Sequence, residues 1–523
     1  MKRAVLAVSL MAVLTPFATS AEEASHSNWR LEGSNTLRFE HYSTSGDESA
    51  SPYGELGTFR TNELDFSLMG NTAPGVSWRF DFGGVYTDSP YRSPYSGFTP
   101  EVMRILHENT TAKLPYRIGV GDVSASTSPL TFSRSFKGLN LSLMPSSSVD
   151  GRRYHVDLLL GRNYRDWRST AEDVAQYRGL SMGVADSRLG ELDLNVIETR
   201  DRYGNVQYVS SVEGRKSWSA FGQALSFSGE WAKLESDTAE SGEDIGFYGE
   251  LRGQHQTRPL DYRLRYDRYG ADFRPMGASV ASDSEAIAAE AGWTFDSNIR
   301  LGGKAQRMES YKSTDNPTRT HSVSMNLSGP LMPSEPDKLV GRLDVVVQDR
   351  ENETGSIDQK STNASLGLDL RQNERNQSRL NLRFSEVDDR RYTGTEQISR
   401  QLSVSHRARV KIKGVEVSVA PGVSYSESDS YGNSATLGPS LSLEAAHERH
   451  RLNLSLGSSA YETDDPAEAV DTDRASLGYQ FKRNEHTFGL DVESSLRDPA
   501  EGESTEAWSA SMYWRYDFSK DLG

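Results

Sequence analysis

The sequence has 523 residues, contains no cysteine and carries a formal net charge of −16 at pH 7. The lack of cysteine excludes disulfide bonds, thiolate metal sites, covalently attached haem and a lipid anchor on cysteine. The acidic balance argues against a nucleic-acid partner, because phosphate binding depends on clustered Lys and Arg side chains.

The N-terminus has the layout of a secretory signal peptide. Met1-Lys2-Arg3 supplies a positive start, residues 4–14 are apolar, and residues 18–21 are small. The apolar run is well short of the ~20 residues that a spanning helix needs, which disfavours an N-terminal membrane anchor. We therefore predict that residues 1–21 are a signal peptide and that residues 22–523 form one exported domain.

The rest of the chain consists of segments in which apolar and polar side chains alternate, as in Leu260, Tyr262, Leu264 and Tyr266. The mean hydropathy is −0.64, and no other apolar run is long enough for a transmembrane helix, so a membrane crossing has to use strands. We expect strands to begin near Trp29, Thr58, Gly75, Arg104, Tyr116, Ser135, Arg152, Ala175, Glu191, Asn205, Ser217, Ile245, Pro259, Glu285, Asn298, Arg319, Lys338, Thr362, Gln377, Gln397, Val415, Ala435, Arg451, Asp473, His486 and Glu506.

The connections between these segments alternate between short and long. Lys413-Gly414 and residues 448–450 are short, whereas residues 271–284 and 462–474 are long and rich in Asp, Glu, Ser and Gly. Tight periplasmic turns and long outer loops produce this alternation in an up-and-down antiparallel barrel. We predict an all-β transmembrane barrel of about 26 strands, in a range of roughly 22 to 28, with both termini in the periplasm and no plug domain.

Two soluble all-β architectures are the alternatives. A chain of β-sandwiches gives no systematic alternation of loop length, and a β-solenoid gives a fixed repeat with similar residues in each coil. Neither pattern fits this sequence. Tryptophans near the ends of the expected strands, such as Trp29, Trp78 and Trp218, match the aromatic girdles of membrane barrels.

The stretch AWSASMYWRYDF at residues 507–518 resembles the last strand of Gram-negative outer-membrane proteins. Trp514, Tyr516 and Phe518 alternate with polar residues, as they do in that class. The resemblance implies that these three side chains face lipid and that the barrel-insertion machinery reads the strand. The sequence departs from the class by continuing to Gly523, which makes Phe518 an internal rather than a terminal signal. We expect this strand to close the ring against the first one.

A barrel of this size raises the question of what fills it. Barrels of about 16 to 18 strands already enclose an aqueous channel, and transporters with about 22 strands hold a plug. We expect either loops that fold inward or a periplasmic or extracellular protein that occupies the lumen. Residues 117–143, RIGVGDVSASTSPLTFSRSFKGLNLSL, resemble the Gly-Asp and Lys-Gly pattern of fimbrial ushers. In size and layout the chain resembles the porin component of porin–cytochrome conduits.

Residues that alternate with the apolar face of each strand should line the lumen. The predicted lumen-lining basic wall consists of Arg263, Arg265, Arg379, Arg383, Arg407, Arg409 and Lys411. Such a wall would favour anions or dock an acidic partner, as rings of Arg and Lys do in anion pores. The alternative is a lattice in which luminal Asp and Glu neutralise these cations.

The sequence predicts no enzyme, no cofactor and no metal site. Residues 179–183, GLSMG, match the spacing of a nucleophile elbow, but that motif needs a strand, a sharp turn and a helix. Leu180 and Met182 instead alternate as in a continuous strand. The histidines are scattered, and only His447 and His450 approach the spacing of metal ligands.

The expected function is an outer-membrane channel or conduit of a Gram-negative bacterium, which passes solutes or sheathes a partner protein. The alternative is an assembly or secretion scaffold for a surface polymer or fibre. The expected partners are outer-membrane lipid, the barrel-insertion machinery and periplasmic chaperones, and no nucleic acid.

Overall fold

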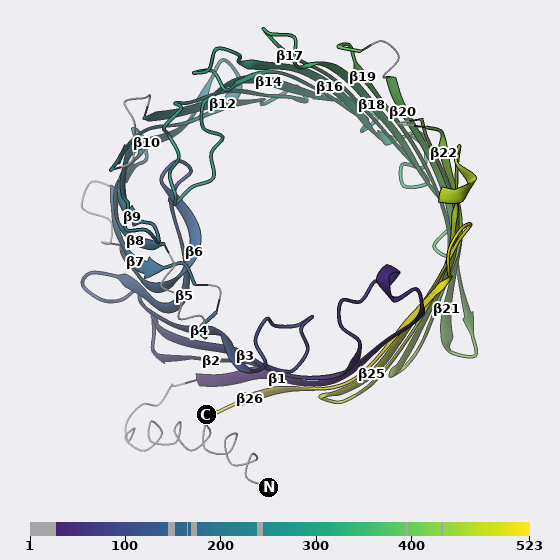
Figure 1. The fold of residues 1–523 in the computed structure, drawn as a ribbon. Helices are drawn as coiled ribbons and strands as arrows, with labels where there is room; N and C mark the ends of the chain where they lie inside the picture. The colour runs from purple at the N-terminus through teal and green to yellow at the C-terminus, as the bar shows by residue number, and fades with distance from the viewer. Residues whose placement is uncertain are drawn as a thin grey trace.

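The computed structural model describes residues 28–144, 152–164, 166–168, 175–237, 244–392, 396–429 and 432–522. These residues form one antiparallel sheet of 26 strands. The sheet closes into a ring, because β1 (Asn28–Gly46) pairs both with β2 (Gly57–Ala73) and with β26 (Thr505–Asp521) (Figure 1). The predicted all-β barrel, its strand number and its closing pair are confirmed. The predicted signal peptide lies outside the described residues.

Each strand pairs with its neighbours in the chain. The first half of the ring continues with β3 (Val76–Thr87), β4 (Gly97–Asn109), β5 (Tyr116–Ser128), β6 (Phe132–Leu143), β7 (Arg153–Arg162), β8 (Gln176–Asp186), β9 (Gly190–Arg200), β10 (Val206–Ala220), β11 (Gln223–Ser236), β12 (Ile245–His255) and β13 (Leu260–Tyr269). The second half comprises β14 (Ser284–Thr294), β15 (Arg300–Ser310), β16 (Thr318–Pro330), β17 (Leu339–Asn352), β18 (Asp358–Arg371), β19 (Asn376–Asp389), β20 (Glu396–Ile412), β21 (Val415–Ser428), β22 (Ser434–His447), β23 (His450–Thr463), β24 (Val470–Arg483) and β25 (His486–Pro499).

Helical structure among the described residues is limited to two single turns in outer loops, η2 (Glu48–Ala50) and η3 (Pro466–Glu468). No helix in this part of the chain is long and apolar enough to cross a membrane.

Short and long connections alternate around most of the ring, as predicted. The exceptions include the three-residue connection after β5 and the connection after β16, which spans residues 331–338 and is longer than the connection on either side of it. Turns of two residues follow β2, β10, β20, β22 and β24, whereas the connection after β13 spans residues 270–283. Lys413 and Asn484, the first residues of two such turns, have positive φ values of 49° and 52°, as tight hairpin turns require. The N–H of Leu522 donates to the carbonyl of Trp29 at 2.7 Å, so both described ends of the chain lie at the end with the short turns.

Two predicted strand starts are wrong by more than a few residues. β4 begins at Gly97 rather than near Arg104. Pro100 therefore lies within the strand, at a register shift where the strand tolerates the missing N–H of a proline. β11 begins at Gln223 rather than near Ser217. The turn before it places Phe221 at a φ of 54°, and an aromatic residue is not a usual signal for that conformation.

The seam between β1 and β26 explains part of the closing strand's composition. Phe518 lies opposite Gly33, and Trp514 lies opposite Leu37. A Cβ at Gly33 would lie only 2.6 Å from the Phe518 ring, so the glycine makes room for the aromatic side chain. Large apolar side chains thus alternate along one face of the seam, as the outer surface of a membrane barrel requires.

Candidate functional site in the barrel lumen

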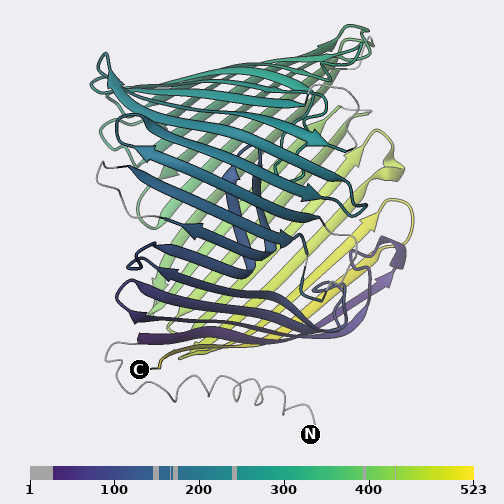
Figure 2. The ribbon, with the colours of Figure 1, turned by 90° about the vertical axis from the view of Figure 1, so that its left-hand side faces the viewer.

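Part of the β5–β6 hairpin leaves the barrel wall and folds into the lumen. β5 pairs with β4 only as far as the pair Gly121 and Arg104, and β6 pairs with β7 only from Lys137 onward. Beyond these points the two strands pair only with each other. They lie inside the ring beside β7 to β9 in Figure 1 and are the two steep blue strands behind the wall in Figure 2. We call residues 122–136 the inner hairpin.

Three glycines in adjacent strands form the hinge at which the inner hairpin departs. Gly121 lies opposite Gly138, which lies opposite Gly161. Gly121 has a φ of +99°, and a Cβ there would clash with the carbonyl oxygen of Met103. A Cβ at Gly138 would clash with the carbonyl oxygen of Leu160. Glycine is therefore required where the backbones approach each other and diverge.

The carboxylate of Asp122 is the hydrogen-bond acceptor and ion-pair partner for three donors at this hinge. Its carboxylate accepts the backbone N–H of Met103 at 2.7 Å and the indole N–H of Trp167 at 2.6 Å. It also forms an ion pair with Lys137, which is 7% exposed and lies directly opposite. A buried ammonium group requires such a partner. The Gly-Asp and Lys-Gly pairs of the sequence are therefore the two sides of the hinge.

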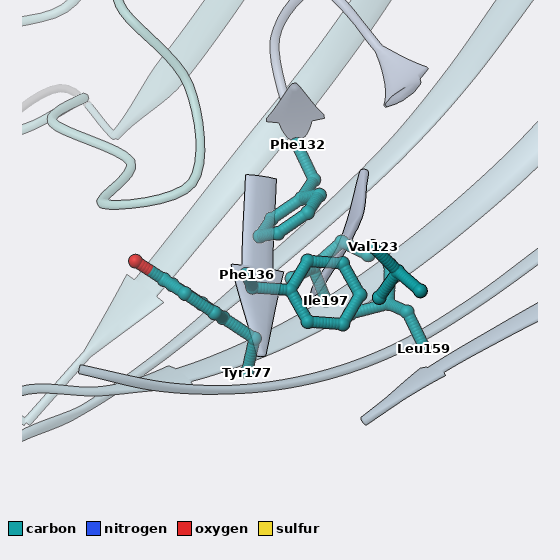
Figure 3. Close-up of a cluster of buried hydrophobic side chains, with 6 residues drawn as sticks. All are labelled: Val123, Phe132, Phe136, Leu159, Tyr177 and Ile197. Carbon is teal, nitrogen blue, oxygen red and sulfur yellow. The ribbon is translucent and has the colours of Figure 1, made fainter. Parts of the chain in front are cut away.

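The inner hairpin covers an apolar patch on the inward face of β7 to β9 (Figure 3). The cluster consists of Val123, Phe132 and Phe136 from the hairpin and Leu159, Tyr177 and Ile197 from the wall. All six side chains are at most 5% exposed. The rings of Phe132 and Tyr177 meet edge to face with their centroids 5.0 Å apart. Because full burial of such a side chain stabilises by about 1.5–3 kcal/mol, this cluster holds the hairpin to the wall.

The tip of the inner hairpin also contacts an outer loop. The loop at residues 270–283 turns inward after β13, and its Phe273 is fully buried in a second apolar cluster that includes Leu130 of the tip. The N–H of Ser133 donates to the carbonyl of Gly277 at 3.0 Å. The hairpin and this loop therefore form one inward-folded unit.

Two further outer loops, residues 47–56 and 88–96, fold toward the lumen beside β1 to β4 (Figure 1). Arg92 of the second loop forms ion pairs with Glu63 at 2.5 Å and with Glu101 at 3.1 Å. Partial burial lowers the pKa of Arg92, but the two carboxylates outweigh this effect and leave its pKa above the ordinary value. The ring of Tyr91 in the same loop also contacts the rings of Tyr42 and Phe59, with centroids 4.7 and 6.0 Å apart, so ion pairs and aromatic contacts together hold this loop.

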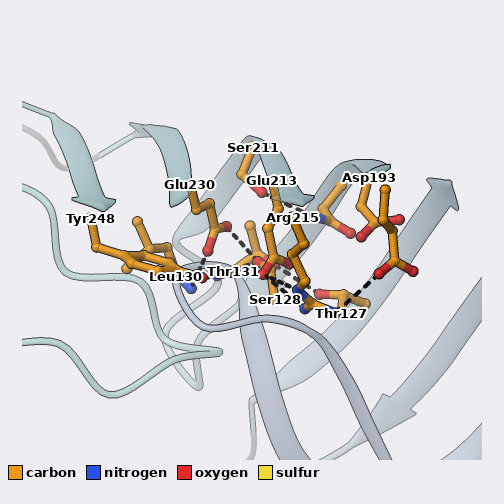
Figure 4. Close-up of polar contacts among 12 residues, drawn as sticks. Thr127, Ser128, Leu130, Thr131, Asp193, Ser211, Glu213, Arg215, Glu230 and Tyr248 are labelled. Atoms are coloured by element: carbon orange, nitrogen blue, oxygen red, sulfur yellow. Dashed lines mark hydrogen bonds and ion pairs between the residues drawn. The ribbon is translucent and has the colours of Figure 1, made fainter. Parts of the chain in front are cut away.

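A buried carboxylate anchors the hairpin tip (Figure 4). Glu230 on β11 is 1% exposed. It accepts a hydrogen bond from the Ser128 hydroxyl at 2.5 Å and another from the backbone N–H of Leu130 at 3.1 Å. The tip therefore supplies the donors that a buried acidic group on the wall requires.

Three carboxylates lie directly opposite one another beneath the hairpin. Asp193 on β9 faces Glu213 on β10, which faces Glu230 on β11. Asp193 is 5% exposed and the two glutamates are 1% exposed. Arg215 donates to Oε1 of Glu213 at 2.9 and 2.8 Å, whereas Oε2 of Glu213 has no hydrogen-bond partner among the described residues. We call these three residues the acidic row; like charges placed directly opposite destabilise a sheet.

The register of the ladder shows where the predicted basic wall lies, because directly opposed residues share a face. Tyr248 contacts the second apolar cluster and is therefore inward, and Glu250, two residues on, lies opposite Arg265. Unbroken register pairs lead from Arg263 on β13 to Ser385 on β19 and on to β20. By this register the inward face carries Arg263, Arg265, Arg379, Arg383, Arg407, Arg409 and Lys411.

These seven cations differ in how they are neutralised. Arg263 forms ion pairs with Glu250 and Glu290, Arg265 with Asp267, and Arg379 with Asp369. The lattice alternative therefore describes these three arginines. Within the described part of the chain, the other four have no carboxylate within 4.0 Å. We call this set the basic strip; it consists of Arg383, Arg407, Arg409 and Lys411 on β19 and β20.

The C-terminal strand presents Trp514, Tyr516 and Phe518 on the face opposite the lumen, whereas Tyr513 is on the inner face. Trp514 and Tyr516 are each 36% exposed, whereas Tyr513 and Arg515 line a hollow of about 670 Å³ on the inner side. This arrangement is compatible with lipid contact by Trp514, Tyr516 and Phe518. Their part in membrane insertion stays a prediction.

The segment GLSMG lies within the continuous strand β8, as the alternation of its residues predicts. Ser181 is 3% exposed and points to the same face as Asn195, its register partner on β9. The sharp strand-to-helix turn of a nucleophile elbow does not occur in β8.

The sequence matches no protein-family model and no curated protein. Solved outer-membrane barrels match over most of the chain. The transporter YddB from Escherichia coli shares 9% identity at a TM-score of 0.40, covering 95% of this chain and 81% of its own. The siderophore receptor PirA from Pseudomonas aeruginosa shares 12% identity at a TM-score of 0.37, with coverages of 92% and 80%. The translocation pore of the P pilus usher PapC shares 13% identity at a TM-score of 0.32, with coverages of 92% and 99%. At these TM-scores the likeness extends to the large antiparallel barrel that the strand pairing itself shows.

Sequence reasoning missed the inner hairpin and the acidic row beneath it. Val123, Phe132 and Phe136 alternate with polar residues as wall residues do, but the apolar positions change phase at the hinge, from Val120 to Val123 and from Phe136 to Leu139. This change of phase, the glycines and the paired Asp122 and Lys137 at the hinge were the available signal. The members of the acidic row lie far apart in the sequence, and only the register brings them together.

Proposed function

We propose that this protein is a channel of the Gram-negative outer membrane that passes anionic solutes through a lumen narrowed by its own inner hairpin. The observation that carries the proposal is the basic strip, on one side of a closed 26-stranded ring. Its four inward-facing cations form no ion pair within 4.0 Å among the described residues, and only Lys411 lies directly opposite a carboxylate, that of Glu416. Rings and rows of Arg and Lys favour anions in pores. The main chain of the described residues leaves the centre of the ring clear (Figure 1).

The two sides of the lumen differ in charge and in accessibility. The acidic row lies beneath the inner hairpin and is nearly inaccessible to solvent. The basic strip lies on β19 and β20, toward the end of the barrel with the short turns, and among the described strands these two pack mainly against their neighbours in the sheet. An anion in the lumen can therefore reach the basic strip, whereas the hairpin covers the acidic row.

A liposome-swelling assay tests this proposal. Vesicles that contain the purified barrel should swell fastest in anionic solutes, more slowly in neutral solutes of equal size, and slowest in cationic ones. Vesicles with a folded barrel that admit no solute, or that admit cations preferentially, would contradict the proposal. Folding is verified by the heat-dependent change in electrophoretic migration that β-barrels show.

A conduit around an acidic partner protein is the second candidate. The 26-stranded ring favours it, because barrels with far fewer strands already enclose an aqueous channel. A photo-crosslinking residue in place of Arg407 in cells should then give one defined adduct with a periplasmic or extracellular protein. The channel proposal predicts no such adduct. Under both candidates we expect Phe518 to serve as the insertion signal and periplasmic chaperones to deliver the chain.

A further inference from the structure

One histidine and two acidic side chains meet on the inward face of β7 to β9, next to the acidic row. His155 on β7, Gly183 on β8 and Asp193 on β9 lie in one register line. Nε2 of His155 lies 3.2 Å from Oδ1 of Asp193. Glu191, two residues before Asp193, completes the group, and one ligand atom from each side chain lies within 4.8 Å of the others.

Gly183 makes this meeting possible. His155 and Asp193 are on strands that are not neighbours, because β8 runs between them. A Cβ at Gly183 would clash with both the His155 ring and the Asp193 carboxylate. The glycine therefore leaves the space over β8 into which both side chains reach.

The three donors have the chemistry and the spacing of a transition-metal site. One imidazole nitrogen and two carboxylate oxygens suit Zn²⁺, which binds such atoms at about 2.0–2.2 Å. In a tetrahedral site these bond lengths place the ligand atoms about 3.3–3.6 Å apart. The His155 and Asp193 atoms already lie near that separation, and Glu191 needs only a small side-chain movement.

Few positive side chains surround His155, Glu191 and Asp193, although the buried carboxylate of Asp193 requires one. Oδ1 of Asp193 accepts no hydrogen bond although the residue is 95% buried, and Oε2 of Glu213, directly opposite, is also without a partner in the described structure. Arg215 is the only Lys or Arg of the described residues within 4 Å of Glu191, Asp193 or Glu213. With His155 neutral, as a metal ligand must be, and the three carboxylates ionised, these groups and the one guanidinium carry an excess of two negative charges, which one divalent cation balances.

We propose that His155, Glu191 and Asp193 bind one Zn²⁺-class divalent cation on the wall of the lumen. The ion joins β7 to β9 across the gap at Gly183 and neutralises the end of the acidic row. A three-ligand site leaves a fourth position for water or for a solute in the lumen. The site does not depend on whether the barrel conducts, so it stands apart from the proposed channel function.

Metal binding to the purified, detergent-solubilised barrel tests the proposal. After treatment with a chelator, the wild-type protein should bind one Co²⁺ per chain with a visible absorption band, and Zn²⁺ should displace it. His155→Ala and Asp193→Asn should each abolish the band. The matched control His321→Ala, on β16 and away from the group, should keep it.

A measurement on the wild-type protein guards against variants that fail to fold. Zn²⁺ should protect His155, and not His321, from modification by diethyl pyrocarbonate, as read by mass spectrometry of the peptides. Three results would each overturn the proposal: no stoichiometric binding by the wild type, unchanged binding in both folded variants, or equal reactivity of His155 with and without Zn²⁺.

Discussion

Releasing the inner hairpin from the wall should change the current through the barrel. The hairpin buries Val123, Leu130, Phe132 and Phe136 to 5% exposure or less. At about 1.5–3 kcal/mol for each buried side chain, these four contribute about 6–12 kcal/mol to docking, before the entropic cost of ordering the segment is subtracted. Apolar packing is therefore the main force that keeps the hairpin against the wall.

The double variant Leu130→Ala with Phe132→Ala should release the inner hairpin from the wall. Truncation of a buried Leu costs about 2–5 kcal/mol and of a buried Phe about 3–5 kcal/mol, so the pair removes a free energy comparable with the whole docking term. Phe132→Ala alone should raise the undocked population about a hundredfold to several thousandfold. In single-channel recordings the double variant should fluctuate between the wild-type current and a larger one.

A variant without the inner hairpin distinguishes an effect of hairpin release from an effect of a misfolded barrel. Asp122 and Lys137 face each other at the hinge, so residues 123–136 can be replaced by Asn-Gly, a two-residue hairpin turn. This variant should show one steady current, larger than that of the wild type. Phe221→Ala is the matched control, because Phe221 is 97% exposed in a turn. If the double variant and the deletion both fold and both give wild-type currents, the hairpin does not narrow the conducting path.

Three further variants test the hinge and the basic strip. Asp122→Asn leaves the buried ammonium of Lys137 uncompensated and should lower the free energy of unfolding by about 3–5 kcal/mol, measured by urea titration in vesicles; an unchanged midpoint would contradict the role given to this carboxylate. Gly121→Ala should reduce the folded fraction after refolding, because of its φ of +99° and the clash with the opposing strand, whereas Gly54→Ala, which has no neighbour within 4 Å, should not. Arg407→Glu combined with Arg409→Glu should shift the reversal potential toward cation preference, and an unchanged potential would remove the strip from the conducting path.

The strand pattern could be predicted from the sequence because each wall strand exposes one face to lipid and the other to the lumen. Side chains then alternate along the whole segment, and most strand starts fall within a few residues of those predicted. The two exceptions, at Gly97 and Gln223, have local causes: Pro100 interrupts the strand signal, and Phe221 occupies a conformation that usually belongs to Gly or Asn.

The lumen could be predicted only in part. Alternation is sufficient to assign Arg407 or Arg409 to one face of a strand, but it carries no information on which carboxylate reaches which cation. The inner hairpin also alternates apolar and polar residues, because it exchanges lipid for the apolar patch of β7 to β9. In the sequence pattern only the change of phase between Val120 and Val123, and between Phe136 and Leu139, distinguishes it from the wall. The group of His155, Glu191 and Asp193 depends on the register of three strands and on the missing side chain of Gly183, and neither is visible in the linear sequence.

The reversal potential of the purified wild-type barrel under a salt gradient in a planar bilayer tests the central claim most directly. The proposed channel predicts a stable current whose reversal potential has the sign of anion preference, set by the cations on β19 and β20. A barrel shown to be folded that carries no current, or one that prefers cations, would contradict the claim.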